Sequence, residues 1–381
     1  MTKSDDKRVP ALRFKGFTDE WEQRKLGEHI IVSKQKNKDN LSLPAFSISN
    51  KNGFIPQEEQ FGKDNTYSKT DKSSNYIVKP KYFAYNPARI NVGSIAYQNT
   101  ITPVLVSSLY EIFRSDNSID DVFLQYWFRS EYFYKQIQRL QEGGVRQYFF
   151  IDKMRESQIY LTNVSEQNKI GSLISKLDNL LTLQQRKLKL LKLMKNIVSY
   201  NLVVSHKLAS NNEIKWKAVY LKDIARIYQP TTITKKDLLP KGIPVFGAND
   251  YIGFYNKYNH ETDQVTICAR GASAGHPNYV KGPVWITGNS MVINVDETYI
   301  NKKFLYTLLT FTDLKRFVTG GAQPQITREN LNSLKILLPS IKAQNNLSAI
   351  IENLSINIRK VQLSINSAKR LKQFLLQNMF I

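Results

Sequence analysis

The chain has 381 residues, 41% hydrophobic and 23% charged, values that fit a globular protein of two or three domains. Its formal net charge of +22 is unusual and indicates a polyanionic partner, nucleic acid before an acidic membrane. No apolar run approaches the ~20 residues of a membrane-spanning helix, which disfavours a membrane role.

Cysteine and histidine usage narrows the class of protein further. The single cysteine, Cys268, excludes a disulfide within the chain and a cysteine-based zinc site. The four histidines are scattered, and none has metal-ligand spacing to another. The N-terminus lacks the apolar core of a signal peptide. These features predict a cytoplasmic chain without a structural metal.

A polar segment, residues 1–20, opens the chain and is expected to be loosely held. Residues 21–162 form a first predicted module, in which short β-type runs bounded by Gly, Pro and Asn precede an aromatic-rich helix, Asp121–Leu140. Residues 163–205 then predict one long helix. The linker is expected at 206–212.

A second module, residues 213–339, repeats the first, and a second long helix is predicted at 340–381. Trp216 follows Trp21 by 195 positions, whereas the Gly-Gly pair at 320–321 follows the pair at 143–144 by 177. The second module is therefore about 18 residues shorter. Asn163 and Ser340 are expected to cap the two helices.

The two long helices share one heptad frame at the offset of 177 residues, which is typical of a coiled-coil seam. About 40 residues would make a helix of roughly 60 Å. Polar residues interrupt the predicted seam at Gln184 and Lys187, and at Asn357 and Ser364; they could set register or be drift on ordinary amphipathic helices. The predicted seam residues are Ile170, Leu173, Leu177, Leu180, Leu191, Met194 and Val198 in the first helix, and Leu347, Ile350, Leu354, Val361, Ala368, Leu371 and Leu375 in the second.

Because neither apolar stripe can remain in water, the helices are expected to pair, antiparallel, with the modules at opposite ends. The predicted fold class is α+β: two globular α/β modules, separated by a coiled coil of two long antiparallel helices, with a pseudo-twofold internal repeat.

Sequence patterns of catalysis are missing. There is no phosphate-binding G-x-x-x-x-G-K-[ST] loop, and no G-x-G-x-x-G follows a strand. Asn86-Pro87-Ala88-Arg89 is similar to the Asn-Pro-Pro-aromatic motif of amino-methyltransferases but lacks its second proline and its aromatic residue. A turn set by Pro87 is the better interpretation, so no catalytic residue is predicted.

Polar loops punctuated by glycine are suited to reading base edges, because Arg pairs with guanine, and Asn or Gln with adenine, in the major groove. For any one of these side chains, ordinary surface-loop polarity is the alternative. The candidates in the first module are Ser49, Asn50, Lys51, Asn52, Arg89, Asn91, Arg146 and Gln147. Those in the second are Asn249, Tyr251, Arg270, Ser273, His276, Asn289, Gln323 and Gln325.

The chain resembles, over nearly its whole length, the specificity subunit of type I restriction–modification enzymes. The features that carry the resemblance are the Trp21 and Trp216 openings, the Gly-Gly pairs, and the segments 85–89 with 92–96, 287–291 and 165–170. Two departures are small: no proline precedes Glu166-Gln167, and the second helix has Ala343-Gln344 in place of Glu-Gln.

The resemblance implies two target-recognition domains, each reading one half of a bipartite double-stranded DNA site. It implies that the paired helices set the unread gap and bind two modification (methyltransferase) subunits, which restriction (motor–nuclease) subunits then join. The chain itself would catalyse nothing and bind no cofactor; S-adenosylmethionine, ATP and Mg would lie on the partner subunits. The alternatives are a stand-alone DNA-modifying enzyme with its own DNA-reading module, and a basic coiled-coil adaptor.

Overall fold

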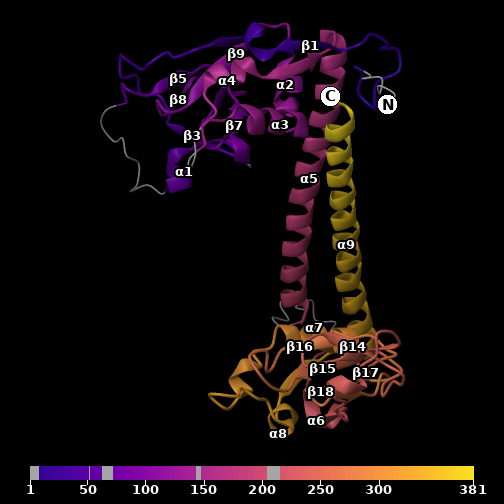
Figure 1. Cartoon of the computed structure of the whole chain (residues 1–381). Helices are drawn as coiled ribbons and strands as arrows, with labels where there is room; N and C mark the ends of the chain where they lie inside the picture. The colour runs from indigo at the N-terminus through magenta and orange to yellow at the C-terminus, as the bar shows by residue number, and fades with distance from the viewer. Residues whose placement is uncertain (1–7, 51, 62–71, 143–146, 204–214) are drawn as a thin grey trace, which may run out of the picture. The chain divides into compact units, whose positions relative to one another are not determined.

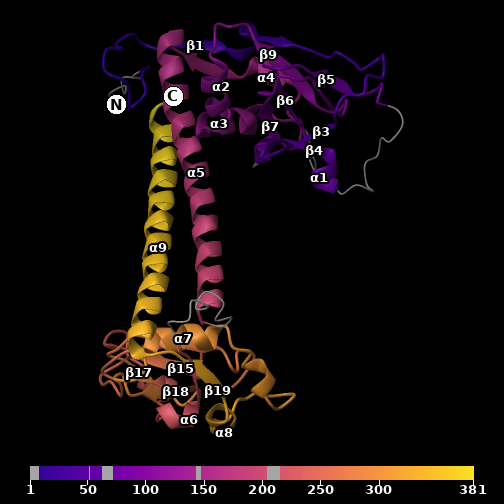
Figure 2. The same cartoon turned by 180° about the vertical axis from the view of Figure 1, so that it is seen from behind.

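A computed structural model describes residues 8–50, 52–61, 72–142, 147–203 and 215–381 (Figures 1 and 2). The chain divides into two compact units. The first unit comprises Met1–Gln185 with Ser364–Ile381, and the second comprises Arg186–Leu363. The predicted linker at 206–212 lies outside the described residues.

The first unit is built on a four-stranded antiparallel sheet of order β2-β9-β6-β7. Its strands are β2 (Ile30–Val32), β6 (Phe83–Tyr85), β7 (Ile95–Tyr97) and β9 (Glu111–Ser115). Three strand pairs accompany it: β1 (Glu22–Lys25) with β10 (Gln158–Leu161), β3 (Phe46–Ser49) with β4 (Gly53–Pro56), and β5 (Tyr76–Val78) with β8 (Val104–Val106). The helices are α1 (Gln57–Phe61), α2 (Asp121–Trp127), α3 (Glu131–Leu140), α4 (Ile151–Glu156), and the 3₁₀ turns η1 (Leu26–Glu28) and η2 (Ile90–Val92).

The second unit repeats the main sheet and the outer strand pair. Its four-stranded sheet has the order β12-β18-β15-β16, and β11–β19 matches β1–β10. A three-stranded sheet, β14-β13-β17, stands where the first unit has the pairs β3–β4 and β5–β8. The strands are β11 (Lys217–Tyr220), β12 (Ala225–Tyr228), β13 (Ile243–Phe246), β14 (Tyr251–Tyr255), β15 (Gln264–Cys268), β16 (Pro277–Val280), β17 (Trp285–Ile286), β18 (Ser290–Val295) and β19 (Lys335–Leu338). The short helices are α6 (Leu221–Ile224), α7 (Lys302–Thr310), α8 (Arg328–Asn332), η4 (Lys235–Asp237) and η5 (Lys315–Phe317).

Strand registers give the same two offsets as the sequence. Glu22 pairs with Leu161, and Lys217 pairs with Leu338. These partners are separated by the offsets of 195 and 177 residues that the sequence shows. The internal repeat is therefore a repeat of topology and register as well as of residues.

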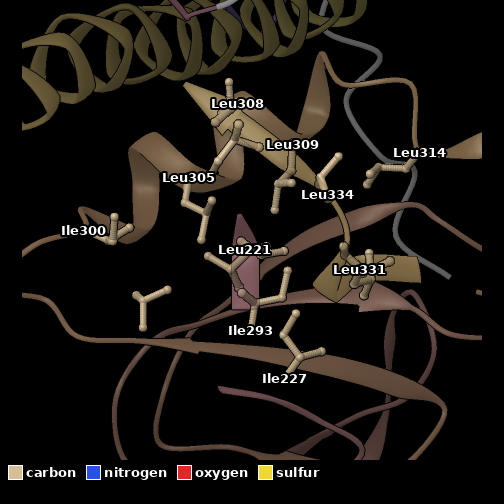
Figure 3. Packing of buried hydrophobic residues seen from close by; sticks show 14 of the residues in the cluster. Leu221, Ile227, Ile293, Ile300, Leu305, Leu308, Leu309, Leu314, Leu331 and Leu334 are labelled. Atoms are coloured by element: carbon tan, nitrogen blue, oxygen red, sulfur yellow. The ribbon is translucent and has the colours of Figure 1, made fainter. Parts of the chain in front are cut away.

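Each unit buries its own core, in which apolar residues of the sheet meet those of the helices. In the first unit, stacked rings of Phe83 and Phe113, 5.2 Å apart, lie edge-on to Phe128 of the segment after α2. In the second unit, Ile227 and Ile293 of the sheet face Leu305 and Leu309 of α7 (Figure 3). These cores hold the strand ends, and the loops between them, in place.

Two uninterrupted helices, α5 (Val164–Val203) and α9 (Ile341–Asn378), each enter both units. The predicted caps are confirmed, because Asn163 Oδ1 accepts the Glu166 amide at 2.9 Å and Ser340 Oγ accepts the Ala343 amide at 3.4 Å. Within each unit one half of α5 lies beside one half of α9 (Figures 1 and 2). In the part of the chain that the structure describes, no helix combines the length and apolarity needed to cross a bilayer.

The helices run antiparallel within the first unit. Lys372, near the end of α9, donates to both carboxylate oxygens of Asp178, in the first half of α5, at 2.6 and 2.8 Å. The same carboxylate accepts the Tyr126 hydroxyl of α2 at 3.0 Å. Asp178 therefore joins α2, α5 and α9.

The seam follows a different frame from the predicted one. Its residues advance in steps of four and three, and all are buried or half-buried. They are Ile170, Ile174, Leu177, Leu181, Gln184, Leu188, Leu191, Lys195 and Val198 on α5, and Leu347, Ile351, Leu354, Ile358, Val361, Ile365, Ala368, Lys372 and Leu375 on α9. The offset of 177 residues holds at every position.

The prediction that five of these residues lie in the seam is wrong, because their side chains are 36–50% exposed. They are Leu173, Leu180, Met194, Ile350 and Leu371. The reason is the way in which α5 packs against α2 of the first module. Gly171 packs against α2, and Asp178 bonds to α2 and α9. Ile174 lies between Gly171 and Asp178 on one helix face, at spacings of three and four, whereas Leu173 is rotated away. Lys187, Asn357 and Ser364 are likewise exposed, so they do not interrupt the seam.

A buried glutamine joins each long helix to its module. Gln167 Oε1 accepts the Asp120 amide at 2.8 Å, and Gln344 Oε1 accepts the Asn301 amide at 2.9 Å; Asp120 and Asn301 are the N-caps of α2 and α7. Each glutamine also donates to the backbone just before its helix, to Thr162 O in the first unit. The repeated glutamine is therefore a structural residue.

The N-terminal segment is held rather than loose where the structure describes it, at residues 8–20. Arg13 forms a two-pronged ion pair with the fully buried Glu166, with distances of 2.7 and 2.8 Å. The backbone of Leu12 donates to Asn378 O at 2.8 Å. The prediction of a loose segment is therefore wrong for these residues. Their position is fixed by the ion pair between Arg13 and Glu166, which lies at the start of α5.

Gly171 is required by close packing, not by backbone conformation. An added Cβ would meet the Phe123 amide nitrogen at 2.9 Å and the Val122 carbonyl carbon at 3.2 Å. We expect Gly171→Ala to lower the free energy of unfolding by about 1–3 kcal/mol, against the gain of about 1 kcal/mol in an exposed helix. Ser172→Ala, at an exposed neighbour, should change it by less than about 0.5 kcal/mol. Urea unfolding measures both, and a stabilised Gly171→Ala would contradict the packing.

Candidate nucleic-acid interface

Four loops of the second unit meet at one end of its sheet, and hydrogen bonds join them. Ser290 Oγ donates to Gly247 O at 2.7 Å, and the Ala269 amide donates to Asn289 O at 3.0 Å. The Gly271 amide donates to Pro324 O at 2.8 Å. These bonds link residues 247–251, 269–276, 287–290 and 319–326, which we call the second loop cluster.

The second loop cluster brings together all eight candidate residues that the sequence predicts for the second module. Seven are exposed, and Ser273 is half-buried. Within the described residues, no side-chain hydrogen bond or ion pair occupies Asn249, Arg270 or Asn289. A backbone fixed by hydrogen bonds thus presents free polar side chains, which suits recognition of base edges.

The first unit holds the equivalent arrangement. Ser94 Oγ donates to Ile48 O at 2.9 Å, and the Phe149 amide donates to Pro87 O at 3.1 Å. These bonds link residues 48–50, 52–53, 86–94 and 147–150, which we call the first loop cluster. It brings together Ser49, Asn50, Asn52, Arg89, Asn91 and Gln147; Lys51 and Arg146 lie outside the described residues.

The loops 86–94 and 268–276 are closed in the same way. The Asn86 amide donates to Ser94 O, as the Cys268 amide donates to His276 O. Gly93 and Gly275 occupy the same place with φ of 85° and 84°, a region that glycine adopts readily. Asn86 Oδ1 also accepts the Ala88 amide at 3.0 Å, so the Asn-Pro-Ala-Arg segment forms a turn, as predicted.

A cavity of about 660 Å³ opens beside the first loop cluster, and Ser49, Asn50, Asn52 and Asn91 form part of its wall. The cavity is also lined by residues that the sequence analysis did not single out, including Asn99 after β7 and Arg129 after α2. Both are exposed. The sequence did not point to Arg129, because it follows a run of aromatic residues that predicts a buried helix.

Titratable groups near the clusters are structural. Burial raises the pKa of the Cys268 thiol, which donates to Arg270 O at 3.2 Å. Burial, with the Glu111 carboxylate nearby, also raises the pKa of Tyr85 far above its usual range. A neutral thiol and a neutral phenol are poor nucleophiles at neutral pH. Across the described ranges, no three His, Cys, Asp or Glu side chains come together as a metal site.

Comparisons with known proteins agree with this architecture. The crystal structure of a type I restriction–modification S subunit from M. genitalium superposes with a TM-score of 0.64, at 18% identity over 98% of this chain and 99% of that one. This similarity concerns the fold. An HsdS subunit from Thermoanaerobacter tengcongensis gives a TM-score of 0.52 at 15% identity, over 94% and 96% of the two chains.

Sequence relatives and a family model complete the comparison. A putative type I restriction enzyme specificity subunit of Haemophilus influenzae is 29% identical over 155 residues, 39% of either chain. The EcoprrI specificity subunit of Escherichia coli is 29% identical over 109 residues. That match spans 29% of this chain and 27% of that protein, so each alignment covers well under half of the relative. The model of the type I restriction modification DNA specificity domain matches residues 18–193 and 213–367, and the chain therefore belongs to that family.

Proposed function

We propose that this chain is the non-catalytic DNA specificity subunit of a type I restriction–modification complex. Each loop cluster reads one half of a bipartite site in the major groove, and α5 and α9 set the gap between the halves. The observation that carries the proposal is the pair of repeat-equivalent loop clusters, each with exposed polar side chains on a backbone held by hydrogen bonds.

Different side chains on the same scaffold support two different half-sites. The loop 86–94 presents Arg89 and Asn91, whereas the equivalent loop 268–276 presents Arg270 and Ser273. Base readout depends on the hydrogen-bonding pattern of such side chains, while the net charge of +22 supplies attraction to phosphates whatever the sequence. The two units would therefore bind DNA similarly but read different bases.

The long helices also carry apolar side chains outside their seam, which supports docking of the two modification subunits. Exposed contiguous apolar surface marks protein interfaces. These residues are Leu173, Leu180, Leu183, Leu190, Leu193, Met194 and Ile197 on α5, and Ile350, Ile356, Leu363, Leu371 and Phe374 on α9. The modification subunits would supply methyl transfer from S-adenosylmethionine. Restriction subunits, with ATP and Mg, would join that complex.

Alanine at Arg270 or Asn289 tests base readout. Loss of a two-pronged base contact costs about 1–3 kcal/mol of discrimination, so each variant should relax or abolish the second half-site and leave the first intact. Genome-wide methylation mapping in a host with no other specificity subunit gives the readout. Arg89→Ala is the reciprocal control and should alter the first half-site alone. Two intact half-sites in Arg270→Ala and Asn289→Ala would refute the assignment.

A further inference from the structure

A second polar surface lies in the second unit, away from the second loop cluster. It is a groove of about 980 Å³, called here the basic groove. Strand β18 connects the two surfaces: Ser290 bonds to the loop cluster, whereas Asn294 and Asp296, at and beyond the other end, line the groove. At ~3.3 Å per residue, five steps along the strand separate the surfaces by about 17 Å.

Four cations and two carboxylates, Asp223 and Asp296, line the basic groove; the cations are Lys215, Lys217, Lys222 and Arg226. All four are exposed, and no ion pair within the described residues neutralises any of them. Lys222 and Arg226 lie over the rings of Tyr220 and Tyr228, at 5.6 and 5.2 Å, which restricts their side chains.

Apolar side chains also line the groove, and we call them its apolar floor. Val219, Ile224, Ile300 and Leu338 line it, and each is buried or half-buried. A phosphate backbone needs cations but no apolar floor. Exposed cations together with buried or half-buried apolar side chains in one groove fit an acidic polypeptide that also buries an apolar side chain. Protein interfaces combine the same two features, an apolar core and a polar rim.

The equivalent segment of the first unit has the opposite net charge. At the offset of 195 residues, Lys215 and Lys217 correspond to Glu20 and Glu22, and Lys222 and Arg226 correspond to Gly27 and Ile31. Residues 20–31 carry three carboxylates and two cations, whereas residues 215–226 carry four cations and one carboxylate. The cationic groove is therefore a property of the second unit alone, although the surrounding fold is repeated.

We propose that the basic groove is a docking site for an acidic, leucine-anchored segment of a partner protein, which recognises the second unit and not the first. A partner that binds here distinguishes the two ends of an otherwise twofold molecule. The inference rests on the proposed function only in assigning DNA to the loop clusters, which leaves the groove for a polypeptide.

Binding of a labelled peptide to the full chain tests the proposal. The probe is a fluorescein-labelled peptide in which single leucines separate short runs of glutamate, followed by fluorescence anisotropy. Lys222→Glu/Arg226→Glu, at two exposed positions, should weaken its binding at least about tenfold, because both rim charges become repulsive. Lys241→Glu/Lys257→Glu makes the same charge change at exposed sites outside the groove and should weaken binding less than about twofold.

Two further measurements separate the possible occupants. The same peptide without leucine should bind several-fold more weakly, because the apolar floor would lose its contact; equal binding would overturn the anchored segment. A DNA duplex that lacks the recognised bases should bind with equal affinity to the groove variant, Lys222→Glu/Arg226→Glu, and to the control variant, Lys241→Glu/Lys257→Glu. A selective loss of duplex binding by the groove variant, or unchanged peptide binding, would overturn the proposal. Methylation mapping of the groove variant reports separately on the proposed function.

Discussion

Replacing Ile174 by aspartate is expected to unfold the first unit. Ile174 is fully buried and lies between Gly171 and Asp178 on the face of α5 that meets α2 and α9. The substitution removes about 2–3 kcal/mol of apolar burial and buries a carboxylate without a partner, which costs several kcal/mol more. A loss above about 4 kcal/mol approaches the whole stability of a domain, about 5–15 kcal/mol.

Leu173→Asp is the matched control, since it makes the same change one residue away. Leu173 is 36% exposed and outside the seam, so its loss should cost less than about 1 kcal/mol. Urea unfolding of both purified variants, followed by far-UV circular dichroism, compares them. An equal loss of unfolding free energy in the two variants would show that Leu173 belongs to the seam. If the proposed docking face is right, Leu173→Asp should instead weaken binding of the modification subunits to a folded chain.

The heptad period could be predicted from the sequence, but its phase could not. Leu173 and Ile174 are both apolar, and so are Leu180 and Leu181. Hydrophobicity therefore allows steps of three and four or of four and three from Ile170. The choice is made by tertiary contacts, at Gly171 against α2 and at Asp178 with Lys372, which join residues far apart in the chain.

The candidate loops could be selected from the sequence because glycine and polar residues punctuate them, but their convergence could not. It depends on bonds such as that from Ser290 to Gly247, 43 residues apart. Asn99 and Arg129 could not be predicted for the same reason. Asn99 follows a β-strand and Arg129 follows an aromatic helix, and only the fold brings both to one cavity. The difference in charge between residues 20–31 and 215–226 can be counted in the sequence. The groove that gathers the second set of charges could not be predicted from it.

Deleting one heptad from each long helix is expected to shorten the unread gap of the recognised DNA. The deletions are Gln184–Leu190 and Val361–Ser367, which are equivalent at the offset of 177 residues. Removing seven residues keeps the four-and-three seam in phase. Each helix becomes about 10 Å shorter, so the gap should fall by about 3 base pairs while both half-sites keep their sequences. Methylation mapping reads the gap and the half-sites together.

A deletion out of phase is the control that separates length from phase. Removing Gln184–Leu188 and Val361–Ile365 takes five residues from each helix, and at 100° per residue this rotates the following seam residues by about 140°. Leu191 and Ala368 would then leave the seam, and the helices should no longer pair, so this variant should direct no methylation. If the in-phase variant methylates sites with the original gap, helix length does not set the spacing, because the loops that read each half-site are unaltered and only the helices have changed.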